Sequence, residues 1–201
     1  MKRLLAVILL GVAVVAIAML TYASSAVTGA NAPQYSADGK MLRPNYRQWV
    51  FLSSGLGMNY NPQTGGPDHP MFTNVYASPE AYNSFLQTGR WPDKTILVLE
   101  VYEAATIGSI NKAGHYQDTL MAVEAHVKDT TRGGDVWKFY GFGANLASAG
   151  AMPDGNPCTQ CHTQHGAVDH TFVQFYPTLL EVARKKGTLK PGVDTSARDG
   201  K

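Results

Sequence analysis

The chain has only two cysteines, no excess of charge after its first few residues, and no internal repeat or low-complexity tract. The formal charge of +2 equals the contribution of Lys2 and Arg3, so the rest of the chain is neutral. A neutral body gives no basis for nucleic acid or an anionic membrane surface as a partner. Hydrophobic residues make up 44% and charged residues 16% of the 201 positions, which predicts one globular domain with its own core plus terminal additions.

The only long hydrophobic run lies at the N-terminus. Lys2 and Arg3 precede 17 apolar residues at 4–20, and the small residues 23–26 follow. This pattern predicts a signal peptide over residues 1–26 and a periplasmic, exported body. The run is long for a signal peptide and short for a membrane span, so an uncleaved N-terminal membrane anchor stays open as the alternative.

The remaining chain reads as a linker at 27–42, a domain at 43–187 and a flexible tail at 188–201. Hydrophobic alternation and β-branched content predict strands at 72–76, 95–102, 120–128 and 136–142. Short connections between consecutive strands imply an antiparallel sheet. Cap residues predict a helix at 79–88, and apolar spacing predicts a second helical stretch at 169–186 that Pro177 should kink or restart. The fold class expected is therefore α+β, an antiparallel sheet packed with helices.

Both cysteines fall in one motif, Cys158-Thr159-Gln160-Cys161-His162. Cys-x-x-Cys-His is the attachment signature of a c-type haem, in which each thiol forms a thioether with a vinyl group of the porphyrin. The adjacent histidine then binds the iron from the proximal side. The motif predicts one covalent haem c per chain, held by Cys158 and Cys161, with His162 as the metal ligand. It also places the haem-binding region towards the C-terminus.

Two other interpretations of the cysteine pair stay open. A redox dithiol would call for a thioredoxin-like βαβ setting, usually near the N-terminus, whereas this motif lies in the last quarter of the chain. A zinc module could add His165 and His170 to the two cysteines, although the gap between the cysteines and histidines is too short for a zinc finger.

The sixth position of the iron has no obvious ligand in the sequence. No methionine follows His162, and His165 and His170 are too close to it to reach the opposite face of a porphyrin easily. A sixth ligand would have to come from upstream, where the candidates are His69, His115, His126, Met58, Met71 and Met121. We expect His126 to lie on the polar face of its strand and Met121 to point into the core, which favours an open distal position.

Several segments together resemble the cytochrome P-460 family, which includes the β-sheet cytochromes c-prime. They are Tyr46-Arg47-Gln48-Trp49, Val75-Tyr76-Ala77-Ser78-Pro79, Trp91-Pro92-Asp93, Val136-Trp137-Lys138-Phe139-Tyr140-Gly141-Phe142 and Phe172-Val173-Gln174-Phe175-Tyr176-Pro177. The resemblance covers roughly residues 43–180. It implies a sheet packed with helices, a homodimer and a five-coordinate haem outside the cytoplasm that meets small nitrogen ligands. Some members oxidise hydroxylamine, and others bind nitric oxide or carbon monoxide without known turnover.

The resemblance also implies which residues lie near the iron. It places Phe72 and the strand that contains Leu99 beside the haem. The hydroxylamine-oxidising members carry a lysine cross-linked to the haem, which we expect near Leu99, where this chain is apolar. Lys94, in the preceding turn, is the candidate for such a link. We therefore expect an uncross-linked haem that binds nitric oxide, with a hydroxylamine- or nitric oxide-oxidising oxidoreductase, or a periplasmic electron-transfer cytochrome with a redox partner, as the alternatives.

Overall fold

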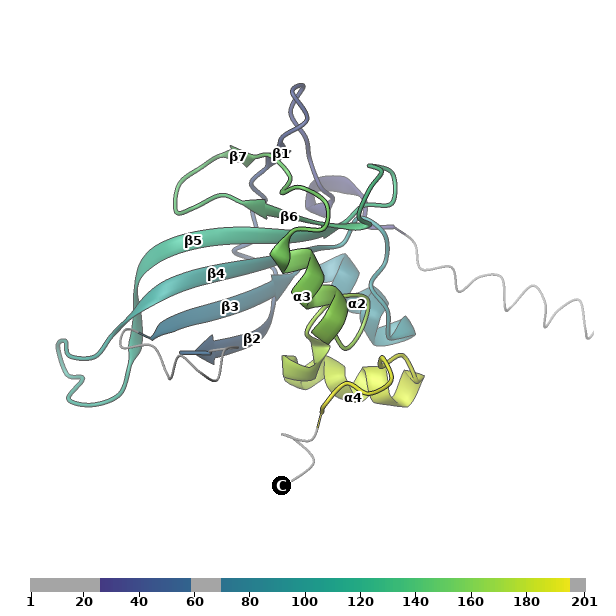
Figure 1. The fold of residues 1–201 in the computed structure, drawn as a ribbon. Helices are drawn as coiled ribbons and strands as arrows, with labels where there is room; N and C mark the ends of the chain where they lie inside the picture. The colour runs from purple at the N-terminus through teal and green to yellow at the C-terminus, as the bar shows by residue number, and fades with distance from the viewer. Residues whose placement is uncertain (1–25, 59–69, 196–201) are drawn as a thin grey trace, which may run out of the picture.

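The main element of the structure, a computed structural model that describes residues 26–58 and 70–195, is a five-stranded antiparallel sheet (Figure 1). Its strands follow one another in sequence order, and each pairs with the next. They are β2 (Val50–Leu56), β3 (Met71–Ala77), β4 (Ile96–Ala105), β5 (Tyr116–Lys128) and β6 (Trp137–Gly141). A second, two-stranded sheet pairs β1 (Met41–Leu42) with β7 (Ser148–Ala149). Together with the three α-helices of the described segments, this arrangement confirms the α+β prediction.

Side-chain alternation divides β5 between the two faces of the sheet. Val123, Ala125 and Val127 are buried together on one face, as the sequence predicted. Glu124 and His126 point to the other face, but His126 is buried there and does not lie on a polar surface as expected. Met121 is also placed wrongly by the prediction, because 45% of its surface is exposed.

Each face of the sheet carries its own hydrophobic cluster. The segment that precedes β2 and the small β1–β7 sheet cover one face, where Met41, Tyr46 and Trp49 pack on Val98 and Tyr140. The helices α2 (Pro79–Thr88) and α4 (Pro177–Lys186) cover part of the other face. The rest of that second face lies beneath the short helix α3 (Pro157–His165), and this is where the site forms (Figure 1).

Helix α2 has the bounds that its cap residues predict. The Ser78 hydroxyl accepts a hydrogen bond from the backbone N–H of Ala81, and Pro79 occupies the first helical position. The helix stops at Gly89, whose φ of 72° is left-handed and therefore suits glycine. Phe85 of this helix is fully buried and packs the helix against the core.

The predicted helix at 169–186 is wrong in its first half. Residues Val168–Thr171 form a tight turn, and a short 3-10 helix, η2 (Val173–Phe175), precedes α4. Asp169 and His170 have φ values of 46° and 60°, which no α-helix contains. Proline cannot continue a preceding helix because it lacks an N–H, so Pro177 starts a new helix here.

The chain ends also contribute to the fold. Segment 27–42, predicted as a linker, supplies Val27 and Met41 to the two clusters. In the predicted tail, the Thr188 hydroxyl donates to the Gly89 carbonyl at 2.8 Å. The predicted export segment lies almost entirely outside the described residues. Among the described residues, no helix has the length and apolar character that crossing a membrane would need.

Candidate functional site

Helix α3 carries the whole Cys-x-x-Cys-His motif. The side chain of Asn156 caps its N-terminus by accepting from the backbone N–H of Thr159 at 3.1 Å, and Pro157 follows at the first helical position. In this helical spacing Cys158, Cys161 and His162 lie within about one turn, so they share one side of the helix. Both cysteines are free thiols and partly buried.

The burial of α3 is unusual for a helix of a globular domain. None of its nine residues is fully buried, so it lacks the apolar stripe that normally holds a surface helix to its domain. A helix this short is marginal without tertiary contacts. An apolar group bound to the two cysteines and the histidine would supply the missing contact, which fits a covalently attached haem.

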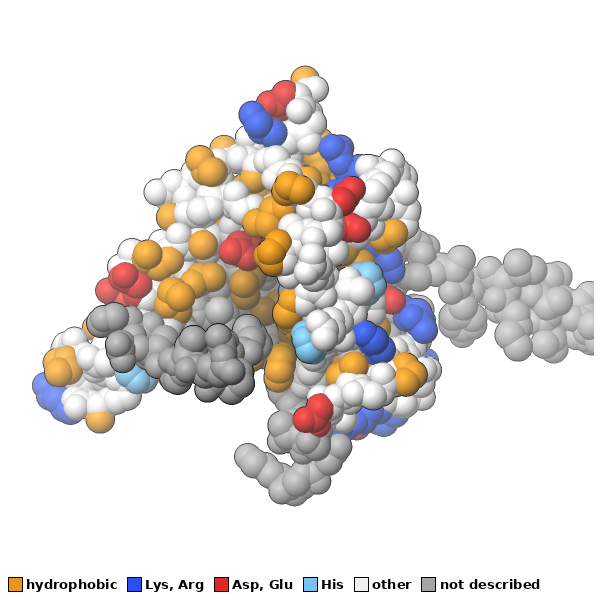
Figure 2. All heavy atoms as spheres, viewed as in Figure 1, with side chains coloured by type: hydrophobic (Ala, Val, Ile, Leu, Met, Phe, Trp, Pro, Cys, Tyr) orange, Lys and Arg blue, Asp and Glu red, His pale blue; other side chains and the backbone are white. Residues whose placement is uncertain are grey.

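A cavity of about 250 Å³ lies between the sheet and the segments that carry α3 and η2. Apolar side chains gather along this hollow (Figure 2). Its lining residues are Ser53, Gly55, Met58, Thr73, Val75, Leu97, Val98, Leu99, Glu124, Ala125, His126, Phe139, His162, Phe172, Phe175 and Tyr176. Its volume is at the small end of ligand pockets. A second hollow, lined by Cys161, adjoins it at Phe172 and Phe175.

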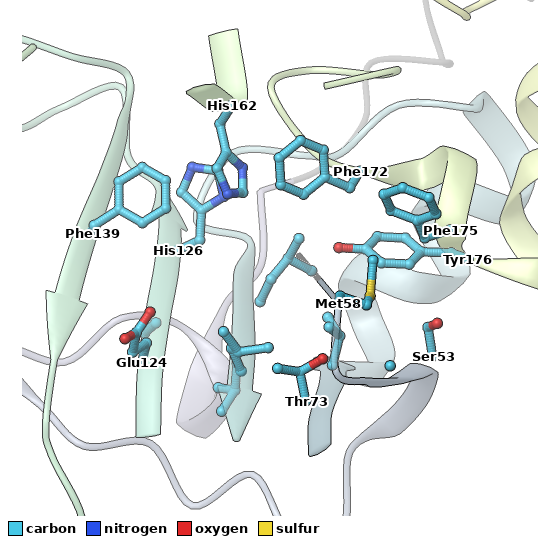
Figure 3. A pocket seen from close by; sticks show the side chains of 16 residues that line it. Ser53, Met58, Thr73, Glu124, His126, Phe139, His162, Phe172, Phe175 and Tyr176 are labelled. Carbon is cyan, nitrogen blue, oxygen red and sulfur yellow. The ribbon is translucent and has the colours of Figure 1, made fainter. Parts of the chain in front are cut away.

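His162 stands at one end of the cavity, with Phe139 on one side and Phe172 on the other (Figure 3). The ring centroids of these two phenylalanines lie 4.9 and 4.2 Å from that of His162. The Nδ1 atom of His162 is 2.8 Å from the carbonyl oxygen of His170. A carbonyl oxygen only accepts, so Nδ1 carries the proton and Nε2 keeps the lone pair that a metal requires. Burial also lowers the pKa of His162, which favours this neutral form.

His126, on β5, is the buried polar side chain that remains unsatisfied in this cavity. Its ring stacks on Phe139 with centroids 4.0 Å apart and meets the His162 ring at 4.6 Å. Neither ring nitrogen has a hydrogen-bond partner among the described residues. Burial, together with nearby His162 and His170, lowers the pKa of His126, so the imidazole is neutral. An unpaired buried nitrogen costs about 1–3 kcal/mol, so a polar group that enters the cavity would stabilise this residue.

The structure places the residues that the sequence assigned to the haem surroundings as follows. Leu99 lines the cavity together with Leu97 and Val98 of the same strand. Phe72 does not line it, because its neighbour Thr73 faces that side of β3. Lys94 lies elsewhere, in a turn where its ammonium group pairs with Asp129. No lysine is among the described residues that line the cavity.

Two of the upstream candidates for a sixth ligand, Met58 and His126, line the cavity. His126 touches His162 directly, whereas two imidazoles on opposite faces of one iron are separated by the porphyrin. In the described arrangement His126 therefore lies beside His162 and not across from it. Met71, Met121 and His115 are exposed, and His69 lies outside the described residues.

The zinc interpretation receives no support from side-chain positions. Within residues 26–58 and 70–195, no three His, Cys, Asp or Glu side chains converge in a way that could hold a metal ion. His165 and His170 are both exposed.

Glu124 could not be recognised as a site residue from the sequence, because alternation alone places it on the polar face of β5. In the structure it lines the cavity at the side away from α3 (Figure 3). Burial in these apolar surroundings raises the pKa of Glu124. The pKa of the Cys158 thiol is raised as well, first by burial and then by the negative charge of Glu124. Both effects favour the protonated thiol form of Cys158.

We expect Glu124→Gln to make the protein more stable than wild type at pH 7. The raised pKa means that the folded state binds the Glu124 proton more tightly than the unfolded chain does. Wild-type stability is therefore fullest at acid pH and falls as pH rises through the folded pKa, whereas glutamine carries no charge to desolvate. The midpoint of thermal unfolding, measured from pH 4 to pH 8, should show an advantage for Glu124→Gln that grows with pH.

The matched control is Glu103→Gln on strand β4, where the side chain is exposed. It should change stability by about 0.5 kcal/mol or less at every pH. An equal response of the two variants to pH would contradict the burial of the Glu124 charge.

Residues 43–173 match the family model described as Cytochrome P460, which is more than half of the chain. No curated protein matches the sequence. The features described above fit a haem: a helix without a buried face, an apolar cavity, an orphaned imidazole and a histidine with its Nε2 lone pair free. By this match and these features, the chain belongs to the cytochrome P460 family and is a haem-binding cytochrome.

Proposed function

We propose that the chain is an exported mono-haem c-type cytochrome with an open distal site that binds small nitrogen ligands such as nitric oxide. The observation that carries this proposal is the apolar cavity beside His162, whose described lining contains no imidazole placed opposite that residue. Export by residues 1–26, as a signal peptide or an anchor, is part of the proposal. So are a homodimer and a periplasmic redox partner, which rest on the sequence and the resemblance.

Each part of the site has a role in this proposal. Cys158 and Cys161 hold one haem covalently through thioethers, and His162 offers Nε2 to the iron. The haem supplies an iron centre that binds or oxidises small ligands. Phe139 and Phe172 fix the plane of the His162 ring. Leu97 and Leu99 keep the cavity apolar and limit the space for a ligand to a few atoms.

We expect the reduced, haem-loaded protein to change its optical spectrum on addition of carbon monoxide or nitric oxide. Leu99→Phe should weaken carbon monoxide binding about fivefold or more, because an overpacked site costs about 1–3 kcal/mol. Titrations monitored in the Soret region give both results. The control is Leu42→Phe, at an exposed position on β1. A low-spin ferrous spectrum that does not change on addition of carbon monoxide would mean that the distal site is closed. It would favour an electron-transfer cytochrome in which a residue such as Met58 is the sixth ligand.

A second candidate function is the oxidation of hydroxylamine or nitric oxide. The observation that favours it is Glu124, a carboxylate of raised pKa in the cavity, which could accept a proton from a substrate. Against it, no lysine is present in the described lining to form a haem cross-link. Mass spectrometry of tryptic haem peptides separates the two functions, because a second peptide on the porphyrin, with steady hydroxylamine turnover, would favour the oxidoreductase.

A further inference from the structure

The turn at Val168–Thr171 adopts a backbone conformation that its sequence does not favour. Thr171 N–H donates to the Val168 carbonyl at 2.8 Å, and the intervening Asp169 and His170 both have positive φ. Two successive left-handed residues define the type I′ turn, which usually contains Asn-Gly or a similar pair. A histidine at its second position is strained, so contacts from outside the turn must hold it.

The second residue of the turn, His170, contacts the imidazole of His162. The carbonyl of His170 accepts the hydrogen bond from Nδ1 of His162. Asp169 and His170 are both left-handed in the conformation that places this carbonyl on the imidazole. The approach is close, since a Cβ atom placed on Gly166 would lie 2.5 Å from the His162 carbonyl oxygen and 2.7 Å from the His170 carbonyl carbon. The turn and the end of α3 are thus packed in direct contact.

The carboxylate of Asp169 ties the turn to the body of the protein. It accepts a hydrogen bond from the backbone N–H of Trp91 at 3.1 Å and pairs with Lys128, on β5, at 3.5 Å. A further pair with Arg90 is solvent-exposed and adds little. The Trp91 indole N–H donates to the Thr171 hydroxyl at 2.8 Å. Trp91 therefore holds both Asp169 and Thr171, the last residue of the turn.

We propose that Asp169 is a positioning residue, which through this turn holds the His170 carbonyl on Nδ1 of His162 and so sets how strongly His162 binds the haem iron. The inference rests on the haem site proposed above. A hydrogen bond to the outer nitrogen of a ligating imidazole raises the basicity of the ligating nitrogen. A loosened turn weakens that bond, and the ferrous state becomes more favourable relative to the ferric state.

The test uses the full-length, haem-loaded protein and two readouts, the iron–histidine stretching band of the ferrous form in resonance Raman spectra and the reduction potential. Asp169→Ala should move the band to lower frequency and raise the potential. Asp169→Gly should have the same two effects. This variant should still fold, because glycine adopts the positive φ of the turn without strain. Asp169→Asn should stay close to wild type in both readouts, because asparagine tolerates this conformation and its amide oxygen can still accept from Trp91.

Asp38→Ala is the matched control, since Asp38 also pairs with a lysine, Lys40 at 2.8 Å, but lies far from this turn in the sequence and is exposed. Unchanged readouts in both Asp169→Ala and Asp169→Gly, or an equal shift in Asp169→Asn, would overturn the inference. Those outcomes differ from failure of the proposed function, which would appear in the wild type as the absence of covalent haem or as insensitivity to carbon monoxide.

Discussion

Replacement of both Cys158 and Cys161 by alanine is expected to abolish covalent haem attachment completely. They are the only two thiols of the chain, and both lie on α3 next to His162. Without them no thioether can form, and His162 alone would hold the haem reversibly. Haem-dependent peroxidase staining of a denaturing gel and the pyridine haemochrome spectrum after acid–acetone extraction measure the loss.

The single variants refine this expectation. Cys158→Ala and Cys161→Ala should each leave one thioether, which shifts the haemochrome band because one vinyl group stays unreacted. Thr159→Ala, between the cysteines, is the matched control and should keep the full haem content. Release of haem from the wild-type protein by acid–acetone would contradict covalent attachment, and haem retained by the double variant would assign it to other residues.

Trp91→Ala is expected to cause the largest loss of stability among single substitutions away from the cysteines. Trp91 is 1% exposed, packs on Phe85 with ring centroids 4.5 Å apart and donates its indole N–H to Thr171. Truncation of a buried tryptophan costs about 3–5 kcal/mol. In a protein of this size that corresponds to a fall of about 6–20 °C in the midpoint of thermal unfolding, measurable by circular dichroism.

Two further substitutions show whether the loss comes from the buried position. Trp91→Phe keeps most of the packing but lacks the N–H, so its loss should be smaller than that of Trp91→Ala. Leu86→Ala, at an exposed position of the adjacent helix α2, should change stability by about 0.5 kcal/mol or less. A Trp91→Ala protein as stable as Leu86→Ala would mean that Trp91 does not connect the core to the turn beneath His162.

The parts of the structure that could be predicted from the sequence depend on local signals. The prediction of a haem protein, which the family match supports, came from a contiguous motif, and the bounds of α2 follow from Ser78, Pro79 and Gly89. Alternation in β5 correctly grouped Val123 with Val127. In each case the residues that decide the structure are close together in the chain, so no tertiary information was needed.

The errors arise where the deciding contact comes from a distant segment. Alternation placed His126 on one face of its strand, but it could not show that segments some 40 residues later cover that face. Asp169 and His170 give no sign of positive φ, unlike glycine, and the spacing of Phe172, Phe175 and Leu179 imitates a helix. On β3 the cavity is lined by Thr73 and not by Phe72, because neighbouring residues of a strand face opposite sides of the sheet. The expected contact of Phe72 with the haem stays a prediction.

The order of the strands has a consequence for how the protein is made. Within the large sheet, each strand from β3 to β6 pairs with the strand synthesised just before it, and the sheet is complete at Gly141. The two thiols follow 17 and 20 residues later, near the end of the chain. A chain that emerges with its N-terminus first can therefore complete the strand pairings before the two cysteines become available for the proposed haem attachment. Haem attachment would then be a late step, which stabilises a sheet that has already formed. It would not be needed to nucleate folding.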